Sequence, residues 1–175
     1  MIKKDPRQLI EQSGLFKTDS FDWILEIILN NMDASSSAID LMIRTTGELI
    51  SSEEKKKLGL RANAKISNKY LNSLTDKGRE DILGSAFLVI HRILHAYNIL
   101  REHEQILKLV PDAKDTYEAE VMVINNEGDE DEDGGTCKAA MALQGKRFKF
   151  DEAPDLPLPT CDADSCRCMF LYYKK

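Results

Sequence analysis

The stretch Arg79–Leu109, with the sequence REDILGSAFLVIHRILHAYNILREHEQILKL, decides the fold. Apolar residues recur in it at steps of four and three, the period of one face of an α-helix. Two such stripes lie next to each other, which gives a wide apolar face and favours the central helix of a bundle over a two-stranded coiled coil. The stripes are Ile82, Ala86, Val89, Ile93, Ala96 and Leu100, and Leu83, Phe87, Ile90, Leu94 and Tyr97.

Shorter helical patterns precede this stretch. Ser20 is a predicted cap for a helix that buries Phe21, Ile24, Leu25 and Ile28, and the serines at 35–37 predict the start of the next helix. Pro111 ends the helical pattern, since proline cannot continue a helix. We therefore predict that residues 1–110 form a helical domain, a bundle of four to six helices joined by short turns.

After Pro111 the pattern changes to that of strands. Residues 117–124 alternate in polarity, and residues 146–150 and 169–173 are short segments rich in aromatic or β-branched side chains. These segments predict a small antiparallel sheet that packs on the helices, with an acidic loop at 126–135. The predicted fold class is thus α+β, with a helical domain at 1–110 followed by a β-sheet and cysteine-cluster region at 111–175.

Composition indicates a folded intracellular protein. The 175 residues are 42% hydrophobic and 31% charged, which is typical of globular proteins that bury a core without disulfides. No apolar stretch follows the basic N-terminus and none is long enough to span a membrane, so we expect a cytoplasmic address without membrane contact. In the cytoplasm the four cysteines would stay reduced.

Charge is unevenly distributed along the chain. Residues 1–110 carry 16 basic and 15 acidic residues, whereas residues 111–175 carry 8 and 15, which together give the net charge of −6. Such an acidic second half would repel a phosphate backbone. In the first half, Lys55–Lys57, Arg61, Lys65 and Lys69 form a basic cluster. Glutamates adjoin the cluster and no aromatic residue is interleaved, so a solvated helix face is favoured over nucleic acid binding.

The cysteines carry the most specific chemical pattern. Cys161, Cys166 and Cys168 form a C-x4-C-x-C cluster, and Cys137 precedes it across a predicted strand. Zinc prefers four soft ligands at tetrahedral corners, so these four residues are the predicted metal ligands, with Asp162 or Asp164 as substitutes for Cys137. The polar residues between Cys161 and Cys168 favour zinc over buried free thiols, which remain the main alternative, ahead of disulfides or an iron–sulfur cluster. A four-cysteine site is coordinatively closed, which indicates a structural zinc ion.

Two neighbouring segments have less specific interpretations. Asp129, Asp131 and Asp133 with Gly134 match the start of a calcium-binding loop, but the position that requires glutamate holds Ala140, so an exposed loop is favoured. The segment 154–159 contains a PxxP spacing that could bind a proline-recognition domain. A stiff spacer, with Leu156 and Leu158 packed on the core, is the favoured reading.

His91, His95 and Glu102 are the candidate catalytic residues. They share one line of the long helix with Asn98, where two imidazoles and a carboxylate could bind a metal ion. The sequence lacks HExxH, a phosphate-binding glycine loop and a nucleophile elbow, so a polar helix face is the favoured reading.

The leading hypothesis is therefore a non-enzymatic intracellular binding or assembly protein with a structural zinc site. Its helical region would bind protein partners, and the chain could form a homo-oligomer. The alternatives are a metal-dependent, hydrolase-like enzyme that uses His91, His95 and Glu102 and, less favoured, a nucleic-acid-binding regulator.

Overall fold

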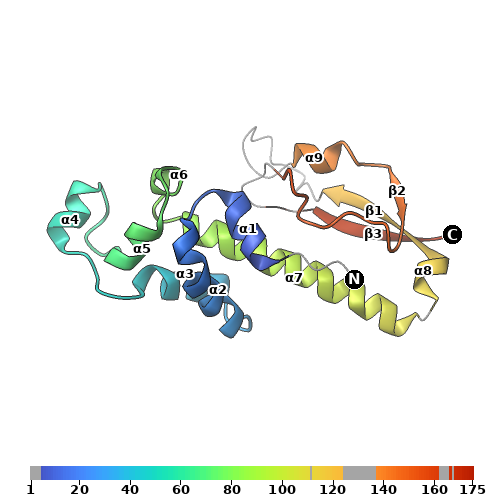
Figure 1. Ribbon diagram of the computed structural model, residues 1–175, viewed down its shortest axis with the longest axis horizontal. Helices are drawn as coiled ribbons and strands as arrows, with labels where there is room; N and C mark the ends of the chain where they lie inside the picture. The colour runs from blue at the N-terminus through green and yellow to red at the C-terminus, as the bar shows by residue number, and fades with distance from the viewer. Residues whose placement is uncertain (1–4, 111, 124–136, 162–165, 167) are drawn as a thin grey trace. The chain divides into compact units, whose positions relative to one another are not determined.

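The computed structural model describes residues 5–110, 112–123, 137–161, 166 and 168–175, and the predicted acidic loop at 126–135 lies outside them. The chain forms two compact units, Asp5–Ile90 and the part from His91 onward. They divide inside the long helix α7 (Ser85–Leu109). The last part of the predicted helical domain 1–110 thus groups with the sheet. The predicted α+β class is confirmed, since helices and an antiparallel sheet both occur (Figure 1).

The unit Asp5–Ile90 consists of short helices, and hydroxyl side chains cap the starts of four of them. Ser35, Ser51, Ser67 and Thr75 each accept a hydrogen bond from a backbone N–H in the first turn of the following helix. Such caps satisfy N–H groups that have no partner within the helix. The elements are α1 (Pro6–Ser13), a 3-10 turn η1 (Thr18–Ser20), α2 (Phe21–Asn30), α3 (Ser36–Thr45), α4 (Ser52–Lys57), α5 (Asn68–Ser73) and α6 (Asp76–Glu80).

The predicted helix after Ser20 is present, but Ser20 does not cap it. Ser20 closes η1, where its hydroxyl donates to the carbonyl oxygen of Lys17 at 2.5 Å, so its oxygen makes no bond to the start of α2. The predicted apolar face is confirmed, because Phe21, Ile24, Leu25 and Ile28 are all buried. The helix after Ser35 also begins as predicted.

Helix α7 begins at Ser85, later than the apolar pattern from Arg79 predicts. The side chain of Asp81 accepts a hydrogen bond from the N–H of Gly84 at 2.9 Å, and Ser85 Oγ donates to the Asp81 carbonyl oxygen. Such local side-chain bonds compete with helical ones. The helical pattern is therefore interrupted between α6 and α7.

Only part of the predicted apolar surface of α7 is buried. Leu83, before the helix, and Phe87 are more than one-third exposed, and Leu109 at its end is 82% exposed. The buried apolar residues of α7 follow mainly the first predicted stripe and are Ala86, Val89, Ile90, Ile93, Ala96 and Ile99.

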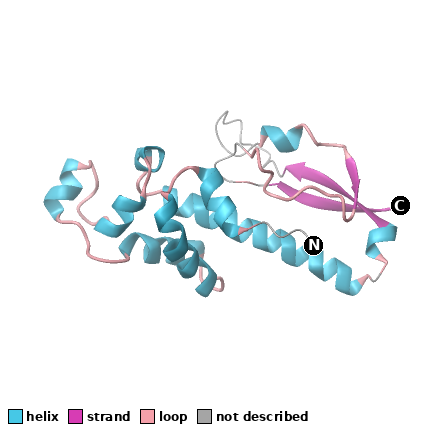
Figure 2. Cartoon of the chain, in the orientation of Figure 1, coloured by secondary structure: helices cyan, strands magenta, loops and turns pink. Residues whose placement is uncertain are grey.

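A three-stranded antiparallel sheet dominates the second unit, as predicted (Figure 2). The central strand β1 (Tyr117–Val123) pairs with β2 (Arg147–Lys149) on one side and with β3 (Cys168–Lys174) on the other. Two short helices, α8 (Ala113–Thr116) and α9 (Lys138–Met141), precede β1 and β2 in the chain and contact β1. Among the described residues, no helix combines the length and apolar character needed to cross a membrane.

Candidate functional site: the cysteine cluster

The four cysteines lie close together in the second unit, although Cys137 is separated from the other three in the chain by α9 and β2. Cys137 immediately precedes α9, and its carbonyl oxygen accepts from the N–H groups of Ala140 and Met141. Cys161 and Cys166 lie in the segment before β3, and Cys168 is the first residue of that strand, paired in register with Val123. All four thiols are free of disulfides.

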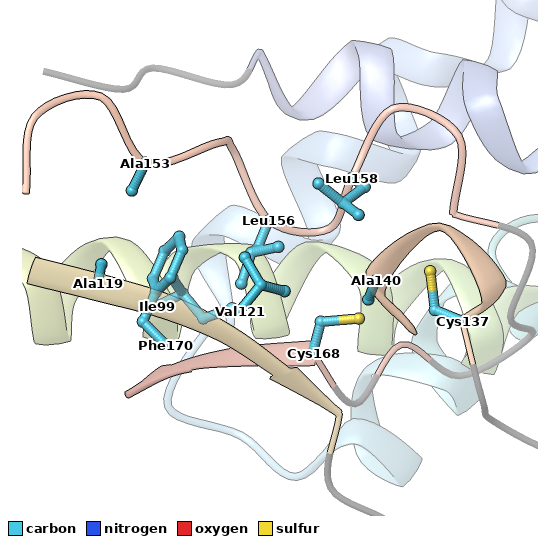
Figure 3. Close-up of a cluster of buried hydrophobic side chains, with 10 residues drawn as sticks. All are labelled: Ile99, Ala119, Val121, Cys137, Ala140, Ala153, Leu156, Leu158, Cys168 and Phe170. Carbon is cyan, nitrogen blue, oxygen red and sulfur yellow. The ribbon is translucent and has the colours of Figure 1, made fainter. Parts of the chain in front are cut away.

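Apolar packing surrounds one side of the cluster. Cys137 and Cys168 are fully buried among apolar side chains from α7, the sheet and the 153–158 segment (Figure 3). Leu156 and Leu158 are 4% and 5% exposed and belong to this core, so the predicted packing of the proline-rich segment is confirmed. Cys161 and Cys166 are partly exposed at the edge of the cluster. The polar residues 162–165 and 167, on which the preference for zinc rested, lie outside the described part of the chain.

The thiols of Cys137 and Cys166 are held in their neutral form. Burial raises the pKa of Cys137. Hydrogen bonding with Cys161 acts to lower the pKa of Cys166, but hydrogen bonding with Cys168 and burial outweigh it and raise the value to about 12. Thiolates, rather than thiols, act as nucleophiles and bind metals. A bound cation is therefore what would deprotonate this cluster near neutral pH.

Helix α7 anchors the backbone of two of these cysteines. Arg92 Nη2 donates to the carbonyl oxygen of Cys161 at 2.9 Å, and His95 Nε2 lies 2.6 Å from the carbonyl oxygen of Cys168. A carbonyl oxygen can only accept, so His95 Nε2 carries a proton and acts as the donor. Burial lowers the pKa of His95, which keeps the ring neutral. Residues three apart on a helix share one face, and this face binds the two cysteine segments.

Arg92 is a buried cation without a matching anion among the described residues. Its relative exposure is 9%, its Nε has no hydrogen-bond partner there, and its guanidinium belongs to none of the ion pairs found in that part of the chain. A buried charge is costly unless an opposite charge compensates it. The sequence did not single out Arg92 as a functional residue. The one indication is that a charged residue stands within an apolar helical pattern.

The candidate catalytic residues are not gathered into a site. His95 is hydrogen-bonded to Cys168, His91 is half-buried and Glu102 is exposed. Within the described residues, no three or more His, Cys, Asp or Glu side chains are already arranged to hold a metal ion. The cysteine thiols also form no such arrangement; they hydrogen-bond to one another instead.

A cavity of about 200 Å³ lies elsewhere in this unit, between the end of α7 and the segment 150–156. His103 stacks on Phe150 at its wall, with ring centroids 4.0 Å apart, and its Nδ1 lies 3.2 Å from the hydroxyl oxygen of Tyr172. Burial is the main cause that lowers the pKa of His103.

Comparisons with protein-family models, with curated proteins and with solved structures gave no match to this chain.

Proposed function

We propose that this protein is a non-enzymatic binding or assembly protein whose second unit is stabilised by a zinc ion bound to Cys137, Cys161, Cys166 and Cys168. Four thiolates would fill the tetrahedral sphere of zinc and leave no position for a substrate. The ion would join the start of α9 to β3 and the segment just before it, which follow later in the chain, beyond β2. A role in holding these segments together follows from that closed coordination.

The observation that carries the proposal is buried Arg92 beside the cluster. Zinc with four thiolates has a net charge of −2, and a guanidinium hydrogen-bonded to the backbone of Cys161 would offset half of it. Without metal, the raised pKa values of Cys137 and Cys166 keep these two thiols neutral, and the part of the chain that the structure describes supplies no ion pair for the buried charge of Arg92. Buried reduced thiols, the main alternative, explain the packing of Cys137 and Cys168 but not this cation.

Zinc binding also requires the thiol side chains to turn from their mutual hydrogen bonds toward a common centre, because the described side chains hold no ready metal site. His95 and Arg92 would keep the cysteine backbones in place during this change. Outer residues of this kind commonly orient metal ligands.

Exposed apolar side chains in the helical unit support the proposed binding role. Leu29 and Met32, at and just after the end of α2, and Leu41 and Met42 of α3 are each more than one-third exposed, and α2 contacts α3. Exposed apolar patches commonly mark protein interfaces. We propose a cytoplasmic protein partner for this surface, with a second copy of the chain as the alternative that light scattering would reveal. A hydrolase using His91, His95 and Glu102 has less support, since His95 is engaged and Glu102 is exposed.

The decisive test is the metal content of untagged protein purified without chelator. Plasma mass spectrometry should find about one zinc per chain, and cobalt substitution should give the intense thiolate-to-metal charge-transfer bands and visible bands of tetrahedral Co²⁺. Replacement of each cysteine by serine should abolish these bands. Ala140→Ser is the matched control, because it adds a hydroxyl to the same buried cluster but removes no thiol. Metal-free protein whose thiols react equally fast with and without added zinc would disprove the site.

A further inference from the structure

A basic pocket lies in the unit Asp5–Ile90, which contains none of the cysteines. Its volume is about 340 Å³, and its walls combine three cations with apolar side chains. None of its lining residues, all within the described part of the chain, is acidic. The residues that matter to its chemistry are Arg44, Arg61, Lys65, Asn63, Leu41 and Leu83.

Arg44 is fixed in place by a partly buried ion pair. Its Nε and Nη2 both donate to Oδ2 of Asp40, at 2.9 and 2.6 Å, and the two side chains are 17% and 9% exposed. A guanidinium carries five N–H groups, so this pairing leaves further donors on Arg44. An arginine held in this way loses little side-chain entropy when it binds a ligand.

Arg61 and Lys65 extend from the loop that follows α4. The backbone of this loop is braced at two points, since Leu60 N–H donates to the Lys55 carbonyl oxygen and Ala64 N–H donates to that of Arg61. Both basic side chains are exposed, and neither takes part in an ion pair within the described residues. With the charge of Arg44 balanced by Asp40, Arg61 and Lys65 leave the pocket with a charge of +2.

We propose that this pocket binds a phosphomonoester group. Such a group is close to a dianion at neutral pH, which matches the uncompensated charge, and its oxygens accept the forked hydrogen bonds of arginine. Asn63 supplies an amide donor, and Leu41 and Leu83 offer apolar contact to the carbon skeleton that carries the phosphate. The lining residues include no aromatic side chain on which a nucleic acid base could stack, so an isolated phosphate fits better than a strand.

The pocket can be tested by titrating inorganic phosphate and a phosphoserine peptide into the full-length chain, at constant ionic strength because salt screens exposed charges. Arg61→Gln/Lys65→Gln should weaken binding of both probes by roughly tenfold or more, since two charge-assisted contacts are lost. Lys56→Gln/Lys57→Gln is the matched control, because it removes the same charge from α4 outside the pocket. The control should bind as the unmodified chain does.

The results of these titrations distinguish a phosphorylated protein from a small phosphorylated molecule, and they can also disprove the pocket. Both variants change exposed side chains, and unchanged thermal melts would confirm that they fold. Tighter binding of the peptide than of inorganic phosphate would assign a phosphorylated protein, whereas equal affinities would assign a small phosphorylated molecule. Absence of phosphate binding at millimolar concentration would overturn the proposal. An equal loss of phosphate affinity in the two double variants would also overturn it. Tighter binding of single-stranded RNA than of either probe would do the same. The result does not depend on zinc, whose proposed ligands lie in the other unit.

Discussion

Arg92 connects the fold to the proposed metal chemistry, because the sign of its contribution to stability depends on the charge beside it. In the chelated protein its buried guanidinium has no ion-pair partner among residues 5–110, 112–123, 137–161, 166 and 168–175, so its replacement by methionine removes a buried charge that no anion found there offsets. In the zinc-bound protein the same change removes the cation that offsets the thiolates and the hydrogen bond to Cys161.

We therefore predict opposite effects of Arg92→Met in the two states. Zinc affinity should fall by about 10- to 100-fold, as is typical when an outer contact to a metal site is lost. The chelated variant should be as stable as the chelated parent or more stable. Competition with a zinc-binding dye and denaturant melts with and without chelator measure both quantities. Arg92→Lys, which keeps the charge, should retain most of the affinity, and an equal destabilisation in both states would contradict the role assigned to Arg92.

Helix α6 depends on a close approach to the turn that follows α1. Thr75, which caps α6, donates from its N–H to the carbonyl oxygen of Leu15 and from its hydroxyl to that of Gly14. Gly78 of α6 lies so near this turn that a Cβ would overlap the Leu15 carbonyl oxygen. Its φ is not positive, so space rather than backbone conformation requires glycine there.

Gly78→Ala should therefore destabilise the helical unit by about 2–3 kcal/mol, because backbone atoms must move to admit the methyl group. Gly84→Ala is a useful comparison, since its Cβ would meet only the end of the Asp81 side chain, which can turn away. That change should cost about 1 kcal/mol, mainly from the lost hydrogen bond between Asp81 and the Gly84 N–H. Urea denaturation measures both values. A smaller loss for Gly78→Ala than for Gly84→Ala would show that the α6 contact is not tight.

Local pattern and long-range contact explain which features the sequence could predict. The three strands and the buried face of α2 follow from polarity patterns within a few residues, and the structure confirms them. The bonds from Arg92 to Cys161 and from His95 to Cys168 join residues 69 and 73 positions apart, and no local pattern encodes them. The helix sequence alone predicts that His91, His95 and Glu102 lie on a polar face. It does not indicate that His95 contacts the segment around Cys168.

The division of the chain inside α7 places the proposed zinc ligands and the only tryptophan in different units. Trp23 belongs to Asp5–Ile90, where its ring lies 4.6 Å from Lys69 Nζ, whereas all four cysteines belong to the part from His91 onward. Each unit has buried apolar residues of its own. Trp23 fluorescence therefore reports on the unit that lacks the proposed zinc ligands, and amide exchange in β1 and β3 reports on the unit that contains them.

Chelation should affect these two reporters differently. Removal of zinc should lower the Tm of the second unit by about 10–20 °C and speed amide exchange in β1 and β3, because structural zinc contributes directly to folding free energy. The thermal transition seen by Trp23 should move by only a few degrees, since α2 and its neighbours hold no zinc ligand. A Cys168→Ser variant without chelator should reproduce the pattern, and Ala140→Ser should not. If the Trp23 transition shifted as far as the exchange of β1 and β3, α7 would couple the units into one cooperative unfolding step.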